Sequence, residues 1–342
     1  MRAPARVGLI GTGWIAERIA DDLTHVRDLR LTTVTGRDPA RLRAFSDRFG
    51  LQQTHSLPEF LAMDVDLVYI ATPPGSHFAL ASQSLHAGKA VVVEKAFTET
   101  ADQASRLIEL AREKQLFLME AMWMRFNPLI RSIADQLRSG RLGQPRVLVS
   151  TAGFAAPPDH RLWSAVSGGG SLLDQVVYPL VLGDLLLGRA VDISARAVHE
   201  GYRNEPVLVD TELAVRVSHS DNRSSLFATS IRAALPCQAD LGCAEGRVLF
   251  PTFFWNPPHV EIIRGGHDPE IVRASPRGRG YVDMLEAVAH ALLAGWKEHP
   301  DCSHEMTLRT MHQIDAIRAV GGPTPSHTMV RPRDATPHRR IP

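Results

Sequence analysis

The first third of the chain alternates short apolar runs with longer stretches of helical periodicity. Repeats of this kind form parallel sheets, because a helix must carry the chain back before the next parallel strand can begin. The alternation therefore predicts a doubly wound α/β sheet. Strands are expected at residues 6–10, 31–35, 67–71, 90–94 and 116–119, and helices at residues 14–25, 39–49, 75–87, 101–115 and 127–139.

From Pro145 onward the pattern changes to short alternating stretches separated by turn residues, which is typical of antiparallel strands. We expect strands at 147–153, 213–218, 225–231, 238–243, 247–250 and 259–263, and closing helices at 281–293 and 304–320. The length of 342 residues favours two domains. The expected fold is therefore α/β plus α+β, with a parallel-sheet domain over 1–121, an open-faced, mostly antiparallel domain over 122–330, and a tail over 331–342.

Composition limits the kinds of molecule that the chain is expected to bind. A formal net charge of +1 gives no basic field for nucleic acid, so a small molecule is the expected partner. The three cysteines show no ligand spacing and favour a reducing compartment. The N-terminus does not resemble a signal peptide, and no run of about 18 apolar residues predicts a membrane span. We expect a cytoplasmic protein that contacts neither membrane nor nucleic acid and needs no metal.

A glycine loop lies directly between the first expected strand and helix. Gly11 and Gly13 begin a Gly-x-Gly-x-x-Ala pattern that ends at Ala16. Gly11 permits the tight turn, Gly13 lets a pyrophosphate approach the backbone, and Ala16 keeps the helix close to the strand. The first domain is therefore predicted to be a dinucleotide-binding Rossmann domain. Cofactor contacts are expected from Gly11, Thr12, Gly13, Trp14 and Ile15.

The second strand predicts which dinucleotide binds. NAD-selective proteins carry an acidic residue about 20 positions after the glycine loop, but here the strand ends at Gly36 and Arg37. Asp38 precedes Pro39 and is expected to cap the next helix, which leaves Arg37 for a 2′-phosphate. Arg41 is either a second phosphate contact or a solvated arginine. NADP is therefore expected in preference to NAD.

Two further loops end at the same sheet edge. Thr72 and Pro73 are expected to line the cofactor, and His77 is either a cofactor contact or an ordinary early helical residue. Lys95 follows Glu94 at the end of an apolar strand, where cofactor and substrate meet in folds of this class. Taken alone, Lys95 is better explained as a solvated lysine.

The best partner for Lys95 is a later glycine-rich segment, 168–179. Its three glycines suggest a flexible approach to a helix, on which Asp174 and Tyr178 share one face and which Pro179 bends. The alternative is an aspartate interacting with the helix dipole and a core tyrosine. Hydride transfer needs a group that handles the hydroxyl proton, and Tyr178 can do so if the Lys95 ammonium lowers its pKa. Asp174 would then orient the lysine or the substrate.

These segments, together with 7–16, 69–77, 87–95 and 119–128, resemble the glucose-fructose oxidoreductase, inositol dehydrogenase and MocA family (Gfo/Idh/MocA). Tyrosine four positions after the aspartate resembles its dihydrodiol dehydrogenase, xylose dehydrogenase and glucose-fructose oxidoreductase branch, and sugar-nucleotide 3-ketoreductases share this arrangement. The resemblance implies that Lys95 and Tyr178 are catalytic with support from Asp174, and that the second domain binds substrate and dimerises. It also implies cofactor contacts from Glu94 and Lys95, nicotinamide and substrate contacts from Trp123 and Arg125, and weaker substrate candidates in Phe154, His160, Arg161 and Trp163.

Two departures from the family pattern bear on the site. Ala96 stands where relatives have proline after the lysine, so the peptide before it is expected to be trans. Gln175 adds a polar group for which the sequence suggests no partner. The favoured function is an NADP-dependent oxidoreductase acting on a secondary alcohol or ketone of a sugar or cyclic diol, probed best by a substrate screen. The alternatives are a sugar-nucleotide ketoreductase and a non-catalytic dinucleotide-binding regulator.

Overall fold

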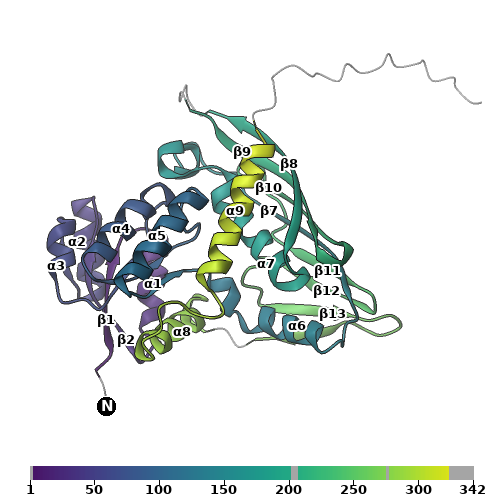
Figure 1. The fold of residues 1–342 in the computed structure, drawn as a ribbon, viewed down its shortest axis with the longest axis horizontal. Coiled ribbons are helices and arrows are strands. Elements are labelled where there is room, and N and C mark those ends of the chain that lie inside the picture. The colour runs from purple at the N-terminus through teal and green to yellow at the C-terminus, as the bar shows by residue number, and fades with distance from the viewer. Residues whose placement is uncertain (1–2, 202–206, 275–276, 323–342) are drawn as a thin grey trace, which may run out of the picture.

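The computed structural model describes residues 3–201, 207–274 and 277–322 and contains two sheets (Figure 1). The first has six parallel strands in the order β3-β2-β1-β4-β5-β6, which confirms the predicted doubly wound sheet. Its strands are β1 (Ala5–Ile10), β2 (Leu29–Thr35), β3 (Gln52–Thr54), β4 (Leu67–Ile70), β5 (Ala90–Val93) and β6 (Leu118–Glu120). Its helices are α1 (Trp14–Leu23), α2 (Pro39–Phe49), α3 (Leu57–Ala62), α4 (His77–His86) and α5 (Ala101–Lys114).

The second sheet has eight strands in the order β14-β13-β12-β11-β7-β10-β9-β8. All neighbouring strands run antiparallel except β7 and β10, which agrees with the expected mostly antiparallel domain. The strands are β7 (Pro145–Gly153), β8 (Ala190–Glu200), β9 (Val209–His219), β10 (Arg223–Ser230), β11 (Ala239–Cys243), β12 (Gly246–Phe250), β13 (His259–Ile263) and β14 (Glu270–Arg273).

Four elements were not predicted: β3, α3, β8 and β14. Three of these are short, and β3 reads Gln-Gln-Thr, which carries no apolar signal. β8 is long, but both sheet edges belong to β8 and β14, and many of their side chains are exposed. Edge strands of this kind lack the apolar alternation on which the prediction depends. The expected tail over 331–342 lies outside the described residues.

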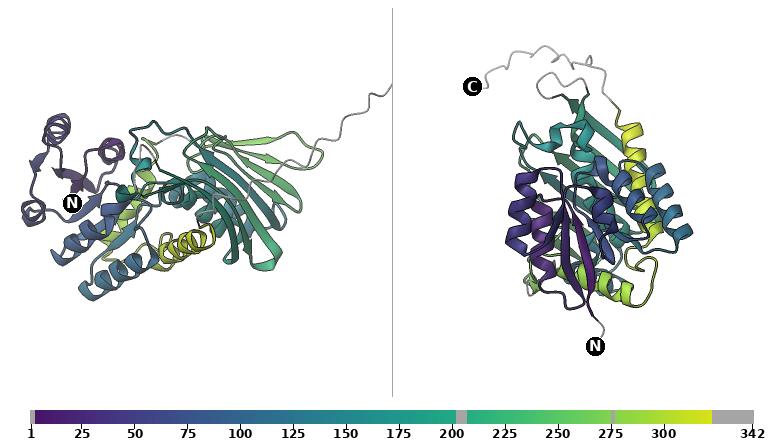
Figure 2. Two further views of the ribbon diagram at one scale, coloured as in Figure 1. Left: turned by 90° about the horizontal axis from the view of Figure 1, so that it is seen from above. Right: turned by 90° about the vertical axis from the view of Figure 1, so that its left-hand side faces the viewer.

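Four further helices complete the second domain: α6 (Pro128–Arg138), α7 (Val177–Leu187), α8 (Val282–Leu293) and α9 (His304–Val320). Among the described helices, those near the eight-stranded sheet gather on one face of it and leave the other face open (Figure 2). α7 is buried nearly all round and fills the space beneath the sheet. α9 packs against both α5 and β8, so the C-terminal helix joins the two domains (Figure 1).

One helical stretch among the described residues, Ala165–Leu187, is long and apolar enough to cross a membrane by length and composition. The most apolar part of this stretch is 83% buried inside the protein, as is typical of a helix in the core.

Candidate active site

The glycine loop follows β1 and contacts the residues at the ends of β2 and β4. Gly11 donates its N–H to the carbonyl of Thr35 at 2.9 Å and has a φ of 118°. A Cβ there would collide with the carbonyl oxygen of Ala71, so only glycine fits this position. A Cβ on Gly13 would have no atom within 4 Å, and Gly13 is the N-cap of α1. The open space beside a helix N-terminus suits a pyrophosphate.

Trp14 is exposed at the start of α1. Its side chain is 64% exposed, and the Arg18 guanidinium lies over its ring at 3.9 Å. Ile15 is half-buried and packs against the core, and Thr12 lies next to Gly36, whose Cβ position is 3.1 Å from Thr12 Cγ2. The turn after β2 is therefore in contact with the glycine loop.

After β2, one side chain caps the next helix and two cationic side chains are exposed. Asp38 accepts hydrogen bonds from the N–H groups of Ala40 at 2.9 Å and Arg41 at 3.1 Å, so it caps α2 as expected. Arg37 and Arg41 are exposed, and within the described chain neither guanidinium has a hydrogen bond or ion pair. Both cations are available to an anionic ligand at this edge.

His77 links the loops that follow β4 and β5. It is fully buried, with Nε2 2.7 Å from the carbonyl oxygen of Thr72 and Nδ1 2.9 Å from that of Ala96. Burial lowers the pKa of His77 to about 4, although both carbonyls oppose this shift. Thr72 also accepts a hydrogen bond from Ser76 at 2.8 Å. His77 therefore supports the loop of Thr72 and Pro73 from below.

The Lys95–Ala96 peptide bond is cis, so the expectation of a trans bond at this position is wrong. Ala96 is fully buried and its carbonyl lies against His77.

The structure brings Lys95, Asp174 and Tyr178 together. Lys95 Nζ donates to the backbone carbonyl of Asp174 at 2.8 Å and lies 3.6 Å from Asp174 Oδ1. The same ammonium lies 4.9 Å from the centroid of the Tyr178 ring. These residues come from the end of β5 and from the start of the helix in the second domain, so the cluster spans both domains.

The helix that carries Asp174 is not a regular α-helix. Residues Leu172–Val176 form a π-helix, which continues into α7. A π-helical carbonyl accepts from the N–H five residues later. For Asp174 that residue is Pro179, which has no N–H, and the carbonyl is bound by Lys95 instead. The kink expected from Pro179 thus takes the form of a π-turn.

The three glycines before this helix are closely packed, which corrects the expectation of a flexible approach. A Cβ on Gly168 would lie 2.8 Å from the backbone nitrogen of Gly75, and one on Gly170 would lie 2.5 Å from Asp210 Oδ1. Asp210 accepts the N–H of Leu172 through Oδ2 at 2.5 Å. The glycines allow close approach to the first domain and to this capping carboxylate.

Gln175 has two partners. Its Oε1 accepts from Ser171 Oγ at 3.0 Å, and its Nε2 donates to the carbonyl of Ser230 on β10 at 3.0 Å. This amide ties the π-helix to the eight-stranded sheet, so its role is structural.

Charge in the cluster is balanced around a neutral phenol. Burial raises the pKa of Tyr178, and although Lys95 and the Trp123 hydrogen bond oppose this, burial prevails. Lys95 therefore favours the phenolate as expected, but burial has the larger effect and the pKa of Tyr178 lies above its usual value. Burial also favours neutral Asp174 and neutral Lys95, but their mutual attraction lowers the pKa of Asp174 and raises that of Lys95. A neutral phenol thus lies beside an ion pair.

Aromatic rings surround this phenol. Trp123 Nε1–H donates to Tyr178 Oη at 3.2 Å, and Tyr178 stacks on Trp255 with centroids 4.9 Å apart. Trp123 stacks on Tyr281 with centroids 4.6 Å apart. No described protein atom accepts the phenol's own proton, so that proton can be given to a ligand.

Sequence reasoning missed Trp255 and Tyr281. Trp255 lies in an aromatic run with Phe253 and Phe254, which was a usable signal. Tyr281 immediately precedes α8 and has no motif around it, so only the fold places it beside Trp123.

The loop 154–163 contributes unequally to the site. Arg161 Nη2 lies 2.7 Å from Asp174 Oδ1, so Arg161 belongs to the cluster. Phe154 and His160 meet edge to face with centroids 5.8 Å apart at the surface. Trp163 donates to the carbonyl of Ala156 at 3.3 Å and packs in a separate small apolar cluster. Arg161 is therefore the candidate of this loop that contacts the cluster of Lys95, Asp174 and Tyr178.

Arg125 is buried and lies 3.4 Å from Asp184, which also binds Arg309 at 2.8 Å. Glu94 is buried beneath Lys95, where it accepts from Tyr69 Oη at 2.7 Å and from the N–H of Lys95 at 3.2 Å. Burial raises the pKa of Glu94 to about 7. Glu94 thus supports Lys95 from the interior, whereas Arg125 is engaged in a buried ion pair with Asp184.

Glu120 makes the stability of this region depend on pH. Burial raises the pKa of this carboxyl to about 7, although Thr307 donates to Oε2 at 3.0 Å, and Oε1 has no partner in the described structure. The pKa of Glu120 is thus higher in the folded protein than in the unfolded chain. Its contribution to the unfolding free energy is therefore fully present below about pH 4.5 and is lost as pH rises through about 7.

We expect Glu120→Gln to unfold at a higher temperature than the wild type at pH 8 and at a similar temperature at pH 5. The gain in unfolding free energy at pH 8 is up to about 3 kcal/mol, from the pKa difference. Thermal unfolding of both proteins at the two pH values measures it. Glu113→Gln, an exposed change on α5, is the control, and an equal shift at both pH values would contradict the assignment.

Comparison with known proteins reveals similarity over most of the chain. A model of the oxidoreductase family with an NAD-binding Rossmann fold (GFO/IDH/MocA) matches residues 5–122, and a model of the GFO/IDH/MocA C-terminal domain matches residues 130–248.

Individual relatives cover both domains. The dTDP-3,4-didehydro-2,6-dideoxy-alpha-D-glucose 3-reductase of Actinomadura kijaniata is 32% identical over 92% of this chain and 95% of the relative. The trans-1,2-dihydrobenzene-1,2-diol dehydrogenase of Bos taurus is 28% identical over 86% of this chain and 90% of the relative. The crystal structure of a 3-ketoreductase from Actinomadura kijaniata with NADP and TDP-benzene has a TM-score of 0.84 at 28% identity, covering 92% of this chain and 97% of that one.

Proposed function

The chain belongs to the GFO/IDH/MocA family of oxidoreductases, and from this premise we propose that it is an NADP-dependent enzyme acting on a secondary alcohol or ketone of a sugar or cyclic diol. The single observation that carries the proposal is the cluster of Lys95, Asp174 and Tyr178 at the carboxyl edge of the parallel sheet. In folds of this class, the crevice beyond that edge is where a dinucleotide and its substrate meet.

The residues present fit a phosphorylated dinucleotide. Gly13 leaves open space at the start of α1, and the exposed guanidinium groups of Arg37 and Arg41 lie at the end of β2, where a 2′-phosphate would bind. The crystal structure of the related ketoreductase contains NADP, which supports the same cofactor here. NADPH, when bound, supplies the hydride for reduction of a ketone.

The protein's own part in the reaction is proton transfer. In the reduction, Tyr178 gives its phenolic proton to the substrate oxygen as that oxygen gains negative charge. The phenolate left on Tyr178 is stabilised by the Trp123 N–H at 3.2 Å and by the Lys95 ammonium over the ring. Asp174, held by Lys95 and Arg161, orients both cations. In the oxidation the same proton moves from the substrate hydroxyl to the phenolate of Tyr178.

The substrate class is tested by a screen with NADPH and NADP over aldoses, cyclic polyols, dihydrodiols, the matching ketones and sugar nucleotides. Turnover of at least one sugar or diol pair supports the proposal. The related reductase makes sugar nucleotides a specific second candidate, and turnover restricted to them would assign that function. The case for a non-catalytic regulator depended on Ala96 standing in the place of proline. Lys95 nevertheless lies against Asp174 and Tyr178. Binding of NADPH with no turnover across the panel would restore it.

Arg37→Ala is expected to weaken NADPH binding about tenfold or more while leaving NADH binding unchanged, because the lost cation pairs only with the 2′-phosphate. Fluorescence titration with both nucleotides measures the dissociation constants. Arg43→Ala is the matched control, because Arg43 is an exposed arginine two residues beyond Arg41 and so on the other side of α2. Equal loss for NADPH and NADH would contradict the assignment.

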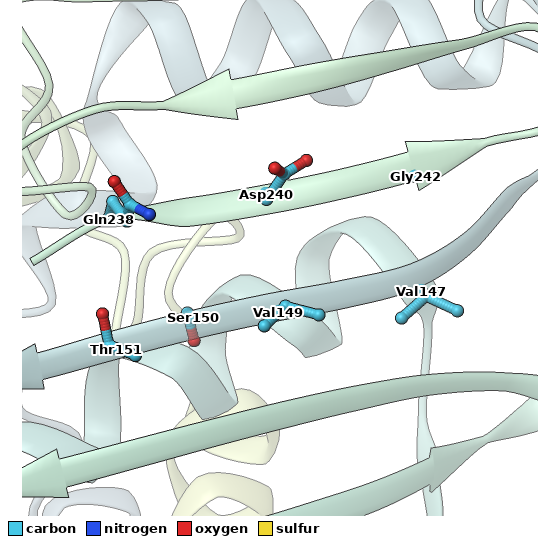
Figure 3. Close-up of a pocket in the computed structure, with 7 residues that line it drawn as sticks. All are labelled: Val147, Val149, Ser150, Thr151, Gln238, Asp240 and Gly242. Atoms are coloured by element: carbon cyan, nitrogen blue, oxygen red, sulfur yellow. The ribbon is translucent and has the colours of Figure 1, made fainter. Parts of the chain in front are cut away.

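A homodimer through the open face of the eight-stranded sheet forms part of the same proposal. Val147 and Val149 on β7 are 38% and 48% exposed, and Figure 3 shows them on this face beside Asp240 of β11. Apolar side chains on a broad uncovered sheet favour burial against a second copy. Mass measurement in solution tests this, and a strictly monomeric mass would exclude the homodimer.

The cytoplasm remains the expected location of the protein.

A further inference from the structure

A tight turn over residues 277–281 connects the dinucleotide-binding helix to the aromatic wall of the site. Asp22 of α1 is fully buried, and its carboxylate accepts the N–H of Arg279 at 2.5 Å and the N–H of Tyr281 at 2.8 Å. A buried carboxylate needs such partners, and here both are backbone amides of one turn. Asp22 therefore fixes the turn in place.

Two glycines make the turn fit against its neighbours. Gly278 has a φ of 56°, and a Cβ there would collide with the Asp22 carboxylate. Gly280 has a φ of 105°, and a Cβ there would lie 2.6 Å from Trp123 Cζ3 and 2.7 Å from Asn256 Nδ2. The turn thus contacts the carboxylate on one side and the indole on the other.

The end of the turn positions the indole that binds the phenol. Tyr281 stacks on Trp123 with centroids 4.6 Å apart and an angle of 12° between the rings. Trp123 in turn donates its indole N–H to Tyr178 Oη at 3.2 Å. Both Trp123 and Tyr281 are buried, so the indole has little freedom to follow the phenol if the turn shifts.

We propose that Asp22 is a positioning residue for the Tyr178 proton donor, acting through the amide of Tyr281 and the ring of Trp123. This inference rests on the proposed function, since it assigns Asp22 to the same proton transfer. Asp22 itself touches neither Tyr178 nor the expected path of the cofactor phosphates: its carboxylate faces the turn. Its effect should therefore appear in the chemical step and not in binding.

Asp22→Asn is the direct test. An amide keeps the size of the carboxylate but can accept only one of the two N–H groups, and its own NH₂ then faces the other donor. We expect kcat to fall about tenfold or more, as a displaced catalytic geometry does, with KM and the NADPH dissociation constant changed less than about twofold. The pH profile of kcat should shift toward higher pH, because the bond that favours the phenolate is weakened.

Asp21→Asn is the matched control. Asp21 is the preceding residue of α1 and makes side-chain ion pairs with Arg48 at 3.5 Å and Arg279 at 3.7 Å, so it is beside the same turn without holding its amides. A kcat and pH profile in Asp22→Asn equal to those of Asp21→Asn would overturn the proposal. If Asp22→Asn does not fold, Tyr281→Leu replaces it, because this change removes the stacked ring and keeps the amide. Normal kcat in Tyr281→Leu would also overturn the proposal.

A measurement without substrate separates this inference from the proposed function. The stacked rings of Trp123 and Tyr281 contribute to circular dichroism in the near ultraviolet, which reports tertiary packing. Asp22→Asn should lose the same part of this signal as Tyr281→Leu, whereas Asp21→Asn keeps it. If the wild type turns over no substrate of the panel, the proposed function fails, and if Tyr178→Phe retains full turnover, Tyr178 is not the proton donor. An unchanged near-ultraviolet signal in Asp22→Asn separately overturns the link from Asp22 to Trp123.

Discussion

Tyr178→Phe is expected to lower kcat by about 10² to 10⁴-fold, the usual range for loss of a general acid or base. The change removes one oxygen and leaves the ring that stacks on Trp255. That oxygen carries the proton to be transferred and also accepts the Trp123 N–H, so the change removes both. Because the ring and its packing remain, NADPH binding should change less than about twofold.

Steady-state turnover and a fluorescence titration with NADPH measure the two quantities on the same preparation. A near-normal kcat would exclude Tyr178 as the proton donor. Loss of NADPH binding together with kcat would instead mean that the change disturbs the whole site, and thermal unfolding of the variant distinguishes this case.

Lys95→Met is expected to lower kcat by about 10² to 10³-fold, the range observed when one electrostatic donor is removed from an active site. Methionine has a similar length but supplies no charge to the phenolate and no donor to the Asp174 carbonyl. Arg161 remains on Asp174 Oδ1, so the carboxylate is not left unpaired. The double variant with Tyr178→Phe should be little worse than either single change, because the two residues act as a unit.

Lys89→Met is a close control for this change. Lys89 stands at the opposite end of β5 and also donates to backbone carbonyls, those of Met63 at 3.0 Å and Val65 at 3.2 Å. Its loss should cost stability and leave kcat unchanged. Equal kcat in Lys95→Met and Lys89→Met would remove Lys95 from the mechanism.

The sequence predicted which residues form the cluster at the sheet edge better than it predicted the environment of these residues. Apolar runs and glycine spacing depend on local geometry, so the parallel sheet and the cluster of Lys95, Asp174 and Tyr178 could be foreseen. Burial depends on the whole fold, and it determines the neutral state of Tyr178 and the position of Trp255. The same holds for the cis bond at Ala96, which no local pattern indicated.

The π-helix shows what a local sequence pattern can predict and what depends on the whole fold. Pro179 signalled a disturbance of the helix, and the sequence correctly located it beside Tyr178. It could not reveal that Lys95 would bind the carbonyl of Asp174, because this contact joins residues 79 positions apart. Edge strands β8 and β14 were missed for a similar reason, since their identity comes from neighbours in the sheet.

The C-terminal segment that joins the domains has a consequence for synthesis of the chain on the ribosome. Leu118 of β6 donates its N–H to the carbonyl of Lys297 at 3.0 Å, and Ala101 at the start of α5 donates to Asp315 at 2.8 Å. The parallel sheet therefore lacks these contacts until almost 200 further residues have been translated, which takes about 10 to 40 s at 5–20 residues per second. During that interval the surfaces of β6 and α5 that α9 later covers are exposed, and the first domain is completed only after α9 has been translated.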